Sequence, residues 1–249
     1  MANPKSRGAV GIHWGLGVAS AAVRFRTLLL RTCLLGALAP ATACTTTHLL
    51  RPLGRGNTRG NVSIGGGPMV RFAGAPIPMP VTTLGVAHGV TDGIDVHADV
   101  HTTAAFFGVA GLDMGAAFHP IASHRAALTV GASITGMSNG RDAVMFADVW
   151  FGTAWRVANF LWLGAGMHNG LRTFTSDDTL RGRSPWAPVP FVHVGIQPRG
   201  GRFGFEIELR WYAPTENGTI QFAPYYAVAD RGALGIALGF NYEVPGSSR

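Results

Sequence analysis

From Val81 to the C-terminus, the chain alternates apolar residues with small or polar residues at a period of two. The segment 94–101 shows this most clearly, because its two sets of alternate positions separate by chemistry. One set is Ile94, Val96, Ala98 and Val100, and the other is Asp95, His97, Asp99 and His101. Successive side chains of a β-strand point to opposite faces, so this is the period of a strand with one apolar face. The pattern predicts an all-β protein.

The alternating segments are about ten residues long and are separated by Gly, Asp, Asn and Pro. The predicted strands are 62–72, 81–90, 94–103, 110–118, 126–136, 144–157, 160–170, 188–197, 202–213, 220–228 and 232–244. Closed antiparallel barrels usually have an even number of strands, so we expect about ten, with 62–72 dropped or a weak strand merged with its neighbour. Short turns at 91–93 and 157–159 are expected to face the periplasm, and longer loops at 137–143 and 171–187 the exterior.

Strands with one apolar face occur in soluble sandwiches and in transmembrane barrels. Charged residues make up only 13% of this chain, about half of the usual ~25%, and Lys is absent after Lys5. Gly and other small residues occupy many positions on the polar faces, which suits a narrow lumen. Aromatic residues stand near strand ends, as in the girdles of membrane barrels: Phe106, Phe107, Trp150, Phe151, Trp155, Phe160, Trp162, Trp211, Tyr212 and Tyr242. We predict an antiparallel transmembrane β-barrel of about ten strands, with a soluble periplasmic β-sandwich as the alternative.

The N-terminal segment has the order of a signal peptide. A basic region with Arg at 24, 26 and 31 precedes a short apolar run at 32–39 and the small residues 41–43. The apolar run is far shorter than the ~20 residues of a membrane-spanning helix. Cys44 follows directly, and this order resembles the bacterial lipoprotein signal, in which the cysteine is lipidated. We predict that residues 1–43 are removed and that Cys44 becomes a lipidated first residue.

The alternative is an ordinary secretory signal cleaved near Ala43, with Cys44 present by chance. Cys33 lies within the predicted signal, so the mature chain has a single cysteine and no internal disulfide. A translation start at Val23 would give the signal its usual length. Thr45 stands where an inner-membrane retention signal has Asp, so sorting to the outer membrane is expected.

The basic isoelectric point of about 10.4 comes mainly from this N-terminal segment. Residues 1–43 contain five basic residues and no acidic residue, which leaves 15 Arg against 13 Asp and Glu in the remainder, a net charge of +2. No basic surface is predicted there, so a nucleic-acid partner is excluded. We divide the mature chain into a lipidated tether with a possible first strand at 44–80 and a β-barrel domain at 81–249.

Two short motifs carry a family resemblance. Cys44-Thr45-Thr46-Thr47 with Arg51-Pro52-Leu53-Gly54-Arg55-Gly56, and Gly89-Val90-Thr91-Asp92-Gly93-Ile94-Asp95-Val96, resemble the outer-membrane β-barrel lipoproteins of myxobacteria and their relatives. The resemblance implies a location and a fold more than an activity, since members of that family are mostly of unknown function. It implies outer-membrane lipids, a covalent lipid anchor and the barrel-assembly and lipoprotein-sorting machineries as partners.

Polar residues on the inner faces are the candidate functional residues. They are Asp95, His97, Asp99, His101, Asp113, Asp148, Glu206, Glu208 and Arg210. Acids and Arg on inner faces can form a salt-bridge network that narrows a pore. The four acids and histidines of 94–101 also have the chemistry of metal ligands. However, same-face residues of one strand are about 7 Å apart, so one ion would use two of them plus residues of a neighbouring strand. We expect no metal and no cofactor.

A hydrolytic or lipid-modifying enzyme that uses His97, His101 or His168 is the remaining alternative. For a hydrolase, His119, His124 and His168 could be combined with Ser123 or Ser133. No Gly-x-Ser-x-Gly and no His-Glu-x-x-His motif occurs. We therefore favour a structural or pore-like outer-membrane barrel with a narrow polar lumen over catalysis.

Overall fold

The computed structural model describes residues 50–72, 75–78, 81–175, 186–217 and 231–246. The strands are β1 (Thr58–Phe72), β2 (Ala75–Pro78), β3 (Thr82–Gly89), β4 (Ile94–His101), β5 (Ala110–Ala122), β6 (Ala126–Ser138), β7 (Ala143–Arg156), β8 (Leu161–Thr175), β9 (Trp186–Ile196), β10 (Phe203–Asn217) and β11 (Arg231–Val244). A short helix, α2 (Thr102–Phe106), connects β4 to β5. In the described part of the chain, no helix is long and apolar enough to cross a membrane.

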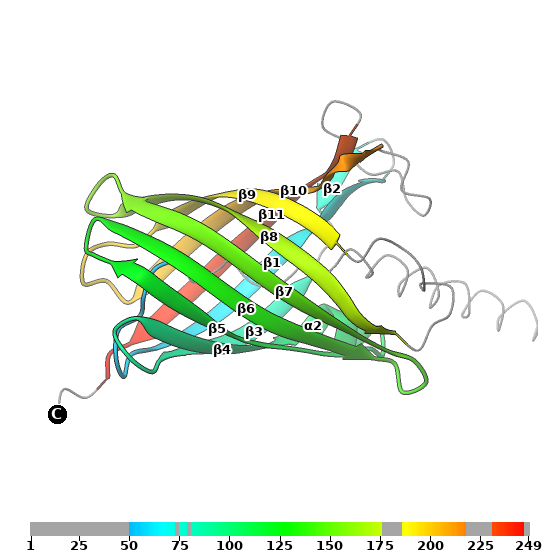
Figure 1. Ribbon diagram of the computed structural model, residues 1–249, viewed down its shortest axis with the longest axis horizontal. Coiled ribbons are helices and arrows are strands. Elements are labelled where there is room, and N and C mark those ends of the chain that lie inside the picture. The colour runs from blue at the N-terminus through cyan, green and yellow to red at the C-terminus, as the bar shows by residue number, and fades with distance from the viewer. Residues whose placement is uncertain (1–49, 73–74, 79–80, 176–185, 218–230, 247–249) are drawn as a thin grey trace, which may run out of the picture. The chain divides into compact units, whose positions relative to one another are not determined.

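The strands form one closed antiparallel barrel (Figure 1). Each strand from β3 to β11 pairs with the next along the chain, β1 pairs with β3, and β1 also pairs with β11. The closing register runs from Thr58 opposite Val244 to Pro68 opposite Gly235. Within the described ranges, strand β2 pairs with the distal part of β1 alone, outside the ring. The predicted antiparallel barrel of about ten strands is confirmed, and it is one closed sheet rather than two stacked sheets.

The barrel begins earlier in the chain than residue 81. Thr58–Phe72 is the strand that closes the ring against β11, so the segment 62–72 that we considered dropping is a barrel strand. A Gly-rich sequence without strong alternation obscured it, since Gly65 and Gly66 interrupt the register at a bulge with positive φ. The strand predicted at 220–228 lies outside the described residues.

Antiparallel order puts four connections at one end of the barrel, between β3 and β4, β5 and β6, β7 and β8, and β9 and β10. The start of β1 and the end of β11 lie at this same end. Both predicted short turns, 91–93 and 157–159, are among these connections. We call this the short-turn end. Helix α2 and the connection between β6 and β7 lie at the opposite end (Figure 1).

Exposure alternates along the strands as the sequence pattern predicts. The exposed positions are largely apolar, as in β4, where Ile94, Val96 and Val100 are 39–51% exposed. The buried positions between them face the interior and are mainly polar or small. This is the reverse of a soluble protein and is the arrangement of a barrel surrounded by lipid.

Three aromatic residues that we expected near the outer girdles instead lie inside. Trp150, Trp162 and Tyr212 are 1%, 5% and 2% exposed. Glycine on the neighbouring strand β6 makes room for Trp150, because a Cβ at Gly131 would lie 2.2 Å from the Trp150 ring. Phe106, Phe107, Phe151, Trp155, Phe160 and Tyr242 are on the outside, as expected.

Candidate functional site

The lumen of the barrel is the candidate site. The structure places every predicted lumen-facing residue in the interior. Asp95, Asp99, His101, Asp113, Asp148, Glu206, Glu208 and Arg210 are each at most 6% exposed, and the side chain of His97 is 10% exposed. These residues do not form one site, because the strand register divides them among several separate groups.

The first group, which we call the Arg/Glu cluster, consists of Arg51, Arg59, Glu206 and Glu243. Arg59 Nη2 lies 2.6 Å from Glu243 Oε1, and Arg51 Nη2 lies 3.2 Å from the same oxygen. Arg59 also lies 4.0 Å from Glu206 Oε1, which accepts a hydrogen bond from Asn241 at 3.0 Å. Two positive and two negative side chains therefore balance each other within the lumen.

Arg51 was not a candidate from the sequence, because it precedes the first strand. Its guanidinium donates to Gln197 and lies 5.2 Å from the centre of the Trp162 ring. Burial, together with the nearby charge of Arg59, lowers the pKa of Arg51 to about 10, so the guanidinium remains charged at neutral pH.

Glu208 and Arg210 form a second group on β10. Arg210 Nε donates to Glu208 Oε1 at 2.5 Å, and His193 Nδ1 lies 3.7 Å from Glu208 Oε2. Tyr212 donates to the carbonyl oxygen of Gly66, which ties β10 to the bulge in β1. Glu208 and Arg210 lie near the middle of β10, opposite Ala237 and Gly235 of β11.

Histidine–aspartate pairs account for most of the remaining polar residues. His119 Nε2 lies 3.0 Å from Asp95 Oδ2, and His168 Nδ1 lies 2.6 Å from Asp148 Oδ2. His119 was missed as a lumen residue, although it is one residue past the alternating segment 112–118. It has the parity of the inward-facing Asp113 and Ala117, so continuing the alternation by one residue would have found it.

The third group, which we call the His/Asp cluster, is His97, Asp99 and Asp113. His97 and Asp99 lie on β4, and Asp113 on β5 is the register partner of Asp99. His97 Nε2 is 3.1 Å from Asp113 Oδ1, and one ligand atom of each residue lies within 4.8 Å of the others. His101 follows on the same face of β4 and is 1% exposed. Within the described residues, neither of its ring nitrogens has a hydrogen-bond partner.

A segment before the first strand enters the lumen, and we call it the plug segment, Leu50 to Leu53. Leu50 is 2% exposed and packs in a cluster with Ala117, Trp150, Ala154, Trp162 and Phe191. Thr129 donates to its carbonyl oxygen at 3.1 Å, and the Leu53 amide donates to Asp95 Oδ2 at 3.0 Å. The sequence predicts only a tether here, because four residues are too few to show a hydrophobic periodicity.

Glycines mark where the plug segment fits. A Cβ at Gly152 would lie 2.6 Å from Leu50 Cδ2, and one at Gly164 would lie 2.8 Å from Leu50 Cδ1. Inward-facing glycines on the adjacent strands β7 and β8 are therefore the sequence signal of an inserted side chain. In the sequence alone, where the inserted segment cannot be identified, the same glycines indicate only a narrow lumen.

The two motifs that carry the family resemblance contact each other. Gly56 donates its amide to the carbonyl oxygen of Gly89 at 2.7 Å, and the Arg55 amide donates to Asp92 Oδ1 at 3.2 Å. A Cβ at Gly89 would lie 2.0 Å from the Gly54 carbonyl oxygen, so this close approach requires glycine. The contact fixes residues 54–56 on the β3–β4 turn and directs the plug segment into the barrel.

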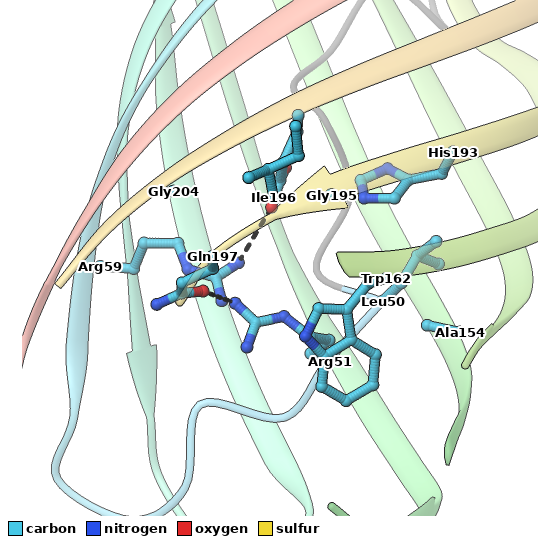
Figure 2. A pocket seen from close by; sticks show the side chains of 11 residues that line it. Leu50, Arg51, Arg59, Ala154, Trp162, His193, Gly195, Ile196, Gln197 and Gly204 are labelled. Carbon is cyan, nitrogen blue, oxygen red and sulfur yellow. Dashed lines mark hydrogen bonds and ion pairs between the residues drawn. The ribbon is translucent and has the colours of Figure 1, made fainter. Parts of the chain in front are cut away.

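A small cavity lies beside the plug segment (Figure 2). It is lined by residues of the plug segment and of the Arg/Glu cluster, together with Trp162 on β8, His193 on β9 and Gln197 just after β9. Figure 2 shows the Arg51 side chain between the Trp162 ring and Gln197. The free volume of about 10 Å³ holds roughly one water molecule. This cavity is therefore too small for a solute larger than water.

The arrangement gives little support to the hydrolase alternative. Ser123 is in the exposed turn before β6, where its hydroxyl donates to the Ala126 carbonyl oxygen. Ser133 is the register partner of Asp148, the acid, and not of His168. A nucleophile must lie within hydrogen-bond reach of its base, with the acid on the base's far side.

Comparison with known proteins gives a fold likeness only. No family model matches the chain, and no curated protein sequence matches it. Among solved structures, an outer membrane channel from Pseudomonas putida F1 aligns with a TM-score of 0.43 and 8% identity, covering 80% of this chain and all of that one. The outer membrane protein OmpT of Vibrio cholerae aligns with a TM-score of 0.33 and 12% identity over 66% of this chain, which spans 56% of OmpT. The KdgM porin aligns with a TM-score of 0.34 and 8% identity, covering 75% of this chain and 98% of that one.

Proposed function

We propose that the protein is a lipid-anchored barrel of the bacterial outer membrane whose narrow polar lumen is a pore closed by the plug segment. The observation that carries this proposal is the insertion of Leu50 to Leu53 into a lumen lined by charged and hydrogen-bonding side chains. A barrel with only a structural role could fill its interior from its own strands, as barrels of about eight strands do.

The membrane location rests on the two faces of the barrel. Large apolar side chains are exposed around the ring, including Leu84, Met114, Ile134, Val149 and Val192, each 50–54% exposed. A continuous apolar exterior of this kind is unfavourable in water and matches the hydrocarbon region of a bilayer. Closure between β1 and β11 removes the unpaired strand edges that lipid could not satisfy.

The proposed closure depends on few contacts. The plug segment is held by one hydrogen bond to the Leu50 backbone oxygen, one from the Leu53 amide, the contacts of Arg51, and the apolar packing of Leu50 and Leu53. Arg51 contacts Glu243, Gln197 and the Trp162 ring. The Arg51 ion pair is part of the balanced Arg/Glu cluster. Withdrawal of the segment would leave Asp95, Glu243 and the ring of Trp162 facing the lumen, so the opened passage would be polar and of mixed charge.

The lipid anchor would be close to the plug. Cys44 lies outside the described residues and precedes Leu50 by six positions. Six residues span at most about 20 Å when fully extended. Lipidation at Cys44 would therefore tether the plug segment near the barrel after any withdrawal, and sorting of the lipoprotein would deliver both together.

Single-channel recording in planar bilayers tests the plugged pore. We expect the full mature chain to be nearly silent and the double variant Leu50→Ala/Leu53→Ala to open a larger conductance, because both plug side chains are truncated. The matched control is Leu84→Ala/Leu112→Ala, which removes the same atoms from two exposed outer positions. Equal conductance in the plug and control variants would overturn the role of the plug segment, and silence in all three would overturn the pore.

The anchor and the membrane location are tested by one further variant. Cys44→Ser is expected to lose incorporation of a fatty-acid analogue while the protein remains in the membrane fraction, because the barrel itself spans the bilayer. Release of the Cys44→Ser protein as a soluble monomer would favour the periplasmic sandwich alternative. Unchanged labelling would show that Cys44 is not the lipidated residue.

A further inference from the structure

Three side chains with the chemistry of metal ligands meet on two neighbouring strands. His97 and Asp99 are two residues apart on the inner face of β4, and β4 alone would hold a metal ion poorly because such residues are about 7 Å apart. Asp113 of β5 is the register partner of Asp99 and provides the third ligand. One nitrogen or oxygen atom of each residue lies within 4.8 Å of the others.

Among the described residues, the two carboxylates of the His/Asp cluster have no arginine to balance them and share the single imidazole of His97. Asp99 and Asp113 are 1% and 0% exposed. In the part of the chain that the structure describes, neither forms an ion pair with an arginine, and the ionisable side chain that contacts Asp113 is His97. Buried carboxylates are normally paired with cations or bound to a metal ion. A divalent cation would supply the charge that is missing.

Several ligand atoms are buried and unused. Within the described residues, Asp99 Oδ2, His97 Nδ1 and both ring nitrogens of His101 have no hydrogen-bond partner. A buried polar atom without a partner is unfavourable. Asp99 therefore contributes one buried carboxylate oxygen without a partner to the cluster in which His97 and Asp113 already meet.

The remaining carboxylate oxygens are held in place by neutral side chains from other strands. Asn61 Nδ2 on β1 donates to Asp99 Oδ1 at 3.1 Å, and Thr135 on β6 donates to Asp113 Oδ2. Such outer hydrogen bonds orient metal-binding carboxylates. They leave Asp99 Oδ2 without a hydrogen bond among the described residues and Asp113 Oδ1 in contact with His97.

Glycines opposite the ligands provide the room. Gly85 is the register partner of Asp99, and a Cβ there would lie 1.5 Å from Asp99 Oδ1. Gly115 is the register partner of His97, and a Cβ there would lie 2.6 Å from His97 Cε1. Any larger residue at either position would displace a ligand.

We propose that His97, Asp99 and Asp113 bind one divalent transition-metal ion of the Zn²⁺ class inside the barrel. One imidazole and two carboxylates favour Zn²⁺ and its first-row neighbours over Ca²⁺, which takes oxygen ligands. The ion replaces the hydrogen bond between His97 and Asp113, and a fourth position remains for water. The proposal rests on the fold and the register and not on the plugged pore.

The test is metal binding by the full mature chain, purified in detergent without a polyhistidine tag and stripped with a chelator. We expect one equivalent of Zn²⁺ in calorimetry and, with Co²⁺, one equivalent with a visible absorption spectrum of nitrogen and oxygen coordination. His97→Gln and Asp113→Asn are each expected to weaken binding at least 100-fold. The matched control His168→Gln removes the histidine of a buried His–Asp pair to which the described residues add no third metal ligand, and it should bind as the unaltered protein does.

Each outcome decides the proposal. Binding of one equivalent that both cluster variants lose and the control keeps supports it. Absence of binding to the unaltered chain, or binding that persists in Asp113→Asn, overturns it. Circular dichroism of each variant separates loss of the site from loss of the barrel, and Gly85→Ala, which keeps all three ligands but displaces Asp99, is expected to weaken binding as well.

Discussion

The Arg/Glu cluster and the His/Asp cluster lie in the same lumen and come from the same alternating pattern. They differ in how their buried charges are balanced. In the Arg/Glu cluster, two guanidinium groups face two carboxylates. In the His/Asp cluster, two carboxylates face one imidazole. A strand pattern decides which side chains point inward, and the charges brought together by register decide whether the group is complete without a ligand.

The difference also appears in the origin of the residues. Arg51, one of the two cations in the Arg/Glu cluster, comes from the plug segment and not from the barrel wall. The His/Asp cluster receives its side chains from the wall alone, on β4 and β5. Charge balance near the short-turn end is therefore coupled to plug insertion, whereas the His/Asp cluster does not depend on it.

The largest expected effect is the loss of a cation from the balanced cluster. Arg59→Met removes the partner of Glu243 and Glu206 and leaves buried carboxylates facing Arg51 alone. Breaking a buried ion pair from one side typically costs about 3–5 kcal/mol, and because Glu243 is partly exposed we expect the lower end. Urea unfolding in detergent measures the loss. Arg125→Met, at an exposed turn position, is the control and should change the stability by less than about 0.5 kcal/mol.

A loss as small in Arg59→Met as in Arg125→Met would mean that the Arg/Glu cluster is not balanced by its internal pairs. The comparison between the two clusters would then have no energetic basis.

A smaller effect is expected from crowding the His/Asp cluster. Gly85→Ala places a methyl group where Asp99 lies, and overpacking of a buried site costs about 1–3 kcal/mol. Gly60→Ala is the matched control on the adjacent β1, because a Cβ there meets no atom within 4 Å. Unfolding of both variants in the presence of a chelator isolates the packing cost from any metal. Equal stability of the two variants would show that Asp99 does not occupy the position in which we describe it.

Whether a residue stands at an odd or an even position of its strand, its parity, predicts which face it occupies. The contacts between residues of different strands depend instead on the register. Parity alone assigns Asp95, His97, Asp99 and His101 to one face, and it also assigns Trp150 to the face of Asp148. We predicted Trp150 to lie in the outer girdle because aromatic residues near strand ends were given more weight than their parity. The same correction applies to Trp162, which has the parity of His168, and to Tyr212, which has that of Arg210.

Parity cannot show which residues of different strands meet. The pairing of Asp99 with Asp113 is set by the β4–β5 register, and a shift of two residues would preserve every inward face while separating the ligands. The insertion of Leu50 is even harder to predict from sequence. It joins a segment that shows no hydrophobic periodicity to glycines more than 100 positions away in the chain. The candidate residues could thus be predicted from sequence and their grouping could not.

The smallest expected effect is the change in stability when one carboxylate is neutralised, and we expect this change to have opposite signs in the two clusters. Glu206→Gln and Asp113→Asn each remove one negative charge with little change of shape. In the Arg/Glu cluster this leaves an excess of positive charge, so Glu206→Gln should destabilise the protein by about 1–2 kcal/mol. In the metal-free His/Asp cluster it relieves repulsion between Asp99 and Asp113, so Asp113→Asn should be neutral or stabilising by up to about 1 kcal/mol.

Urea midpoints measured with a chelator, and again with Zn²⁺, give both values. With Zn²⁺ present the unaltered protein should gain stability and Asp113→Asn should not, because only the former binds the ion. A destabilisation of metal-free Asp113→Asn equal to that of Glu206→Gln would mean that the charge of Asp113 is already compensated within the protein, and the two clusters would then be alike.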